Sequence, residues 1–118
     1  MAIDIPYKEE NGFLVPDIEF PPQPEGEIGY FGRRRREYLR EHDRRMYHYL
    51  QLNMEMKAHL LEIQEQAELR METLIKQMKE ERGVTEELKA KDQMGWVSRM
   101  TAIREEAQAV VLREIIYV

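Results

Sequence analysis

The sequence contains no cysteine, and none of its five prolines lies beyond residue 24. The lack of cysteine excludes a disulfide framework, a thiolate zinc site, an iron–sulfur cluster and a cysteine nucleophile. No apolar run approaches the roughly 20 residues that span a bilayer. The N-terminus also lacks the basic and apolar segments of a secretory signal. We therefore expect a cytoplasmic protein that makes no use of a membrane.

Residues that support catalysis or metal binding are equally scarce. His42, His48 and His59 do not have the spacing of zinc ligands, and no His-Glu-x-x-His motif occurs. Ser98 is the only serine, and it does not lie in a nucleophile motif. We expect no enzymatic activity, no metal, no cofactor and no small-molecule substrate.

Charge is abundant but unevenly distributed along the 118 residues, which total −5. Residues 1–28 hold seven acidic residues and one lysine, whereas residues 29–49 hold seven arginines and three acidic residues. This contrast predicts an acidic, proline-rich extended arm over 1–28 and a helical domain over 29–118.

The arm contains a signal for a small β-hairpin. Ile3-Asp4-Ile5 and Phe13-Leu14-Val15 flank Glu9-Glu10-Asn11-Gly12, in which Asn-Gly tolerates the positive φ angles of a tight turn. Since an isolated hairpin is marginal in water, we expect it to rest on an apolar surface.

Beyond Gly32 the sequence predicts helices over about 33–52, 54–82 and 85–117. Asp43 and Thr85 are candidate N-caps, and Gly83 is a candidate C-cap. Apolar residues recur at helical spacing and form two stripes, which are candidates for the core or for an interaction surface. The stripes consist of Met56, Leu60, Ile63, Ala67, Met71, Leu74 and Met78, and of Trp96, Met100, Ile103, Ala107 and Val110.

These patterns predict a mainly α protein, built as an elongated antiparallel helical hairpin with shorter helices and the small N-terminal hairpin. The long helix would measure roughly 43 Å. A compact domain of this size has a radius of gyration of only about 13–14 Å. Either the molecule is elongated, or a second copy covers the stripe in a homodimer.

The arginine run is the main candidate for a binding surface. On one continuous helix, Arg33, Arg36, Arg40 and Arg44 fall on one side, whereas Arg35 falls among apolar positions. Guanidinium groups suit phosphate oxygens because they present a planar fork of donors and stay charged. The candidate phosphate contacts are Arg33, Arg34, Arg36, Arg40, Arg44 and Arg45. The alternative is that these arginines pair with acidic residues of the arm or of their own helix.

Three segments resemble a known family. They are residues 28–42, from Ile28-Gly29 to Glu41-His42, residues 83–97, which begin Gly83-Val84-Thr85-Glu86-Glu87-Leu88, and the ending Glu114-Ile115-Ile116-Tyr117. A stretch around Gly12-Phe13-Leu14-Val15-Pro16 is similar as well. Together they resemble the transposon-encoded TnpV family. The resemblance implies a small accessory protein of a bacterial mobile element and carries over no functional residue.

The sequence thus predicts an accessory factor that assists excision or integration by contacting DNA or the recombinase. The alternative is a protein-interaction module, a dimeric helical hairpin without direct nucleic-acid contact.

Overall fold

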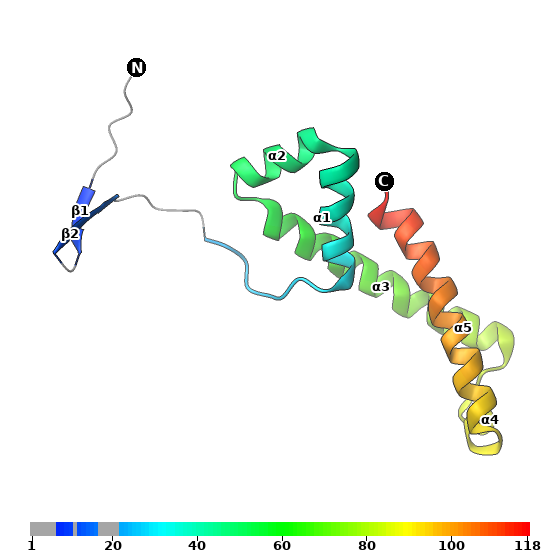
Figure 1. Cartoon of the computed structure of the whole chain (residues 1–118). Helices are drawn as coiled ribbons and strands as arrows, with labels where there is room; N and C mark the ends of the chain where they lie inside the picture. Colours follow the sequence, from blue (N-terminus) through cyan, green and yellow to red (C-terminus); the bar gives the residue numbers. More distant parts are fainter. Residues whose placement is uncertain (1–6, 11, 17–21) are drawn as a thin grey trace.

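The structure is a computed structural model that describes residues 7–10, 12–16 and 22–118 (Figure 1). Two short strands, β1 (Tyr7–Glu10) and β2 (Phe13–Pro16), pair antiparallel with Tyr7 opposite Pro16. Gly12 between them has a φ of +81°, a value that favours glycine. The apolar segment at residues 3–5 and Asn11, on which the hairpin prediction also depended, lie outside the described residues.

Residues 22–29 form neither helix nor strand, and the chain from Tyr30 onward is almost entirely helical, which confirms the mainly α fold class. The helices are α1 (Tyr30–His42), α2 (Arg44–Leu52), α3 (Met56–Arg82), α4 (Glu86–Lys91), α5 (Gln93–Val111) and the short π-helix η1 (Leu112–Ile116).

The first predicted helix, over 33–52, is divided into α1 and α2 at Asp43. The backbone of Asp43 leaves the helical region, with φ −141° and ψ 71°. Its carboxylate accepts a hydrogen bond from the backbone N–H of Met46 at 3.2 Å and so caps α2. The candidate cap at Asp43 is confirmed, and the structure shows that the helix is not continuous through residues 33–52, a point that the sequence left open.

The long helix α3 ends where the sequence predicts. Gly83 takes the left-handed conformation with φ +64°, and the N–H of Val84 donates to the carbonyl oxygen of Lys79 at 2.9 Å. Thr85 then caps α4 by accepting from the N–H of Leu88 at 3.3 Å. Both predicted caps are confirmed. In Figure 1, α5 runs back along α3, so that the two helices form an antiparallel hairpin.

The last predicted helix, over 85–117, is also interrupted. Asp92 has φ −143°, and its carboxylate accepts from the N–H of Gly95, which ends α4 and starts α5. At its C-terminal end α5 widens into η1, where the N–H of Tyr117 donates to the carbonyl oxygen of Leu112 at 2.8 Å. The continuous helix was a wrong prediction because an aspartate side chain competes for backbone donors and breaks it.

The core follows α3 in three clusters. The first joins α1 and α2 to the start of α3, the second joins its middle to α5 and η1, and the third joins its end to the α4–α5 region. Their buried members are Leu39, Leu50, Met56 and Leu60, then Ala67, Leu74, Ala107, Val111 and Ile116, and then Val84, Met100 and Ile103.

Every residue of the two predicted stripes is buried or half-buried within this single chain. Helices α1 and α5 cover the stripe of α3 from opposite ends, so the stripe needs no second copy to leave water. Burial of this kind contributes about 25 cal/mol for each Å² of apolar surface.

Candidate nucleic-acid interface

The outward face of α1 carries three exposed arginines, Arg33, Arg36 and Arg40. Their spacing of three and four residues places them on one side of the helix. Among the described residues, the one hydrogen bond from the side chain of Arg33 goes from Nη1 to the backbone oxygen of Ile28, at 3.4 Å. Within the part of the chain that the structure describes, none of the three forms an ion pair. No carboxylate of residues 22–118 is therefore paired with these three guanidinium groups.

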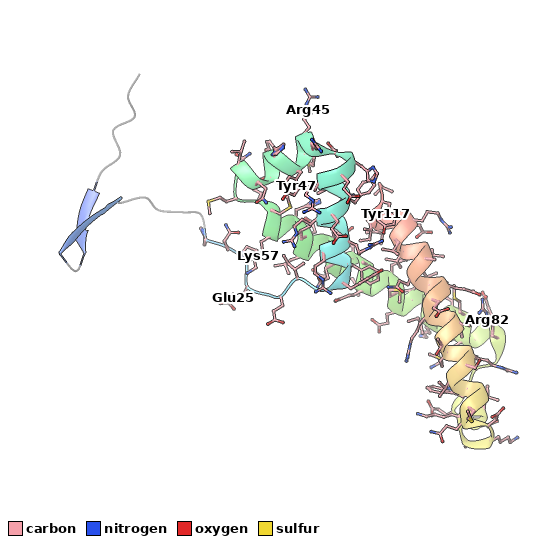
Figure 2. All side chains as sticks on the ribbon, in the orientation of Figure 1. Glu25, Arg45, Tyr47, Lys57, Arg82 and Tyr117 are labelled. Atoms are coloured by element: carbon pink, nitrogen blue, oxygen red, sulfur yellow. The ribbon has the colours of Figure 1, made fainter. Side chains whose placement is uncertain are left out.

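Arg44 and Arg45 continue this surface from the first turn of α2. Both are exposed, and neither has an ion-pair partner among the described residues. Figure 2 shows Arg45 extending from the start of α2 away from the other helices. Cations at a helix N-terminus are disfavoured by the helix dipole, which adds further positive potential there. The Asp43 carboxylate at the cap of α2 offsets part of this unfavourable charge.

The break at Asp43 changes how these arginines meet. Arg40 at the end of α1 and Arg44 at the start of α2 line one hollow of about 370 Å³, together with Glu41, Tyr47 and His48. Arg40 and Arg44 thus share a surface across the corner between the helices, as they were expected to do on one continuous helix.

Arg34, the remaining predicted phosphate contact, is half-buried and engaged within the molecule. Its guanidinium donates to the hydroxyl of Tyr117 and lies 5.7 Å from the centre of that ring. Oε2 of Glu37 lies 3.7 Å from Nη1 of Arg34. The hydrogen bond to Tyr117 raises the pKa of Arg34, with Glu37 adding a smaller effect in the same direction. Arg34 is therefore committed to the contact between α1 and the C-terminal segment.

Arg35 is buried, with 8% of its surface exposed, as its place among apolar positions indicated. Its Nη1 donates to the backbone oxygens of Ile116 at 2.8 Å and Val118 at 2.7 Å, and its Nε donates to Nε2 of His59 at 3.3 Å. Burial lowers its pKa, and Tyr38 and Asp43 oppose that shift. Arg35 is a structural residue that fastens α1 to η1 and α3.

The alternative that the acidic arm neutralises the arginines can be examined over the last part of the arm. Glu25 and Glu27 are exposed, and neither forms an ion pair within the described chain. Asp4, Asp17 and Glu19 lie outside the described residues, as do the side chains of the acids in β1.

Sequence reasoning missed a second feature of this region, the outward face of α2. Arg45, His48, Tyr49 and Leu52 are all exposed and follow the spacing i, i+3, i+4, i+7. That spacing is visible in the sequence, but only the packing of α2 shows which of its faces is exposed.

Other kinds of site find little support in the described chain. It contains no group of three or more histidine, aspartate or glutamate side chains arranged to hold a metal ion. None of its helices combines the length and apolar character needed to cross a membrane.

The family model of the transposon-encoded protein TnpV matches residues 6–116 of the chain. No curated protein matches the chain, and no solved structure does. The family match covers nearly all of the sequence, including the arginine-bearing helices and the helical hairpin. The chain therefore belongs to the family of transposon-encoded TnpV proteins.

Proposed function

We propose that this protein is a non-enzymatic, cytoplasmic accessory factor that binds DNA of its bacterial mobile element and assists excision or integration. Its family supplies the transposon context. The single observation that carries DNA contact is the surface of five exposed arginines without acidic partners in the described chain, which we call the basic surface: Arg33, Arg36, Arg40, Arg44 and Arg45.

The physical basis is electrostatic. Each guanidinium that neutralises a DNA phosphate releases condensed counterions, so that affinity falls as salt rises. The overall charge of −5 opposes indiscriminate binding, and the basic surface therefore restricts contact to one end of the molecule.

The test is the fluorescence anisotropy of a labelled duplex, titrated with protein over 50–200 mM salt. The triple variant R36Q/R40Q/R44Q should bind more weakly. Its slope of log affinity against log salt should shrink by about 0.9 for each lost contact, or about 2.7 in all. The matched control is R99Q/R104Q/R113Q, which makes the same charge change at exposed positions on α5 and η1.

The control variant should bind as the wild type does. Equal affinities and slopes for the two triple variants would overturn the proposal, as would wild-type protein that does not bind DNA. Excision of the element in cells, measured by amplification of the closed donor site, should fall with the first variant and not with the control.

A second candidate is docking of a protein, either the recombinase or a second copy of this chain. It is favoured by a largely apolar hollow of about 660 Å³ beside the α3–α4 turn, which Ile75 and Val84 line together with Lys76 and Lys79. Light scattering tests the homodimer directly: a mass near 14.2 kDa would exclude it. Pull-down of the purified recombinase by wild type but not by K76E/K79E would support the other partner.

A further inference from the structure

Helix α2 has two distinct faces. Met46, Tyr47 and Leu50 turn inward, and Leu50 is 4% exposed in the core cluster with Leu39 and Leu60. The outward face carries Arg45, His48, Tyr49 and Leu52, and we call it the outer face of α2. Its large side chains leave much of their surface in water, since Tyr49 is 55% exposed and Leu52 is 84% exposed.

Cations border α2 at both of its ends. At the N-terminal end, Arg40 and Arg44 line the hollow that His48 also lines. At the C-terminal end, a second hollow is lined by Arg36, Lys57 and Gln51, among others. Arg40 and Arg36 of α1 thus each line a hollow that α2 also lines, and Lys57 of α3 lines the second of them.

No acidic residue lies on α2 itself. The acids nearest in sequence are Glu41, which lines the first hollow, Asp43, whose carboxylate caps the helix, and the exposed Glu55. Gln51 is held in place by a hydrogen bond from its Nε2 to the hydroxyl of Tyr47 at 3.2 Å. The outer face itself carries nitrogen donors, an aromatic ring and an aliphatic group, and Arg40 and Arg44 lie beside its His48.

Resting on the proposed function, we infer that α2 enters the major groove of duplex DNA and contacts base edges with its outer face. The major groove is about 12 Å wide and admits one α-helix. Arg45 can donate to the acceptors N7 and O6 of guanine, and Leu52 can pack on a thymine methyl group. The flanking arginines would contact the phosphates and fix the helix in register.

Charge complementarity favours duplex DNA as the partner of the outer face of α2. A helix that enters the groove passes between two phosphate backbones, so cations are needed on its borders and acids are excluded from its outer face. A protein partner would require an acidic surface of matching shape, and binding of such a partner without DNA is an outcome of the test below.

The test selects duplexes from a randomised library with the full-length protein, and then measures the affinity of the selected and a scrambled duplex by anisotropy. The wild type should prefer the selected duplex by at least about 10-fold, because one good base contact gives that much discrimination. H48A/L52A should lose about 10-fold of this preference while keeping its affinity for the scrambled duplex and its salt slope.

Met94→Ala with Val97→Ala is the matched control, because it removes exposed apolar side chains at the start of α5. It should leave the preference unchanged. Circular dichroism should show the same helix content for both double variants, since all four substituted side chains point to solvent.

A base analogue tests which groove is used. Replacing guanine by 7-deazaguanine removes the N7 acceptor from the major groove and leaves the minor groove intact. This change should lower wild-type affinity for the selected duplex by about 10-fold, whereas a minor-groove competitor such as distamycin should not.

The outcomes separate the two proposals. Salt-dependent binding without any enriched sequence would overturn the inference about α2 and leave the proposed function standing. Enrichment that H48A/L52A does not reduce, or that only the minor-groove competitor abolishes, would also overturn it. Failure to bind any duplex would remove both proposals, and binding of an acidic protein through the same residues would then replace them.

Discussion

The guanidinium of Arg35 lies 2.8 Å from the carbonyl oxygen of Ile116, a residue 81 positions away in the sequence. This buried hydrogen bond joins α1 to the end of the helical hairpin. Because the donor is charged, the bond is stronger than one between neutral groups. The contact also fixes which arginines of α1 remain outside.

Arg35→Ala should lower the free energy of unfolding by about 2–4 kcal/mol, since one buried and one partly buried backbone oxygen lose their donor. Arg36→Ala, one residue along and exposed, should change it by less than about 0.5 kcal/mol. Urea unfolding followed by circular dichroism measures both. Similar midpoints for the two variants would contradict the structural role of Arg35.

The neighbouring His59 predicts a pH dependence of stability. Burial lowers its pKa, the charge of Arg35 lowers it further, and Glu62 partly opposes both effects. Its Nε2 accepts from Arg35 and must therefore be unprotonated. The unfolded chain binds this proton more tightly, so the stabilising contribution is complete above the ordinary pKa of about 6.5 and is lost as pH falls through the lower folded value.

Urea midpoints at pH 7.5 and pH 5.0 measure this effect. His59→Gln should show a smaller loss of stability on acidification than the wild type. His42→Gln, at an exposed position on α1, serves as the control and should keep the wild-type loss. An unchanged loss in His59→Gln would assign the pH dependence to other groups.

Gly32→Ala should destabilise the fold even though alanine favours helices by about 1 kcal/mol. An added Cβ would lie 2.5 Å from Cγ2 of Ile28 and 3.0 Å from Oε1 of Gln64. Relief of this overlap should cost roughly 1–3 kcal/mol, visible as a lower Tm. Ser98→Ala, on the exposed side of α5, supplies the control for propensity alone. A rise in Tm for Gly32→Ala would show that the link before α1 can move aside.

The corner at Asp43 couples stability to the basic surface. Asp43→Ala removes the cap of α2 and should cost about 1 kcal/mol, whereas Asp43→Asn keeps an accepting oxygen and should cost less. If the corner brings Arg40 and Arg44 to one surface, Asp43→Ala should also weaken DNA binding more than Asp43→Asn does. Equal DNA affinities for the two variants would show that the cap of α2 has no influence on DNA binding.

The core stripe of α3 can be tested with two leucines. Leu60 is fully buried, and Leu60→Ala should lower the free energy of unfolding by about 2–5 kcal/mol. Leu69 lies on the same helix but is 59% exposed, and Leu69→Ala should have a much smaller effect. Comparable losses at the two positions would mean that Leu69 is covered in solution, as in a dimer.

Much of the helical architecture could be predicted because helix ends depend on nearby residues. Gly83 and Thr85 satisfy the free backbone groups between α3 and α4, and Asp43 does the same for α2. Asp43 and Asp92 also divide the first and last predicted helices, because each carboxylate caps the helix that follows it. Propensity favours continuation through Asp43 and Asp92, and the choice to break depends on how the segments then pack.

The sequence alone determined the apolar stripes of α3 and α5, through helical spacing. It also determined the high density of positive charge on α1 and α2, through composition. Only the tertiary structure decided which arginines are engaged within the molecule and which are exposed. Arg34 and Arg35 bind η1 and the last residues, more than 80 positions away, whereas Arg36 and Arg40 remain in solvent. Local spacing cannot separate these neighbours, because the partners that bury two of them arrive only when the hairpin folds back on α1.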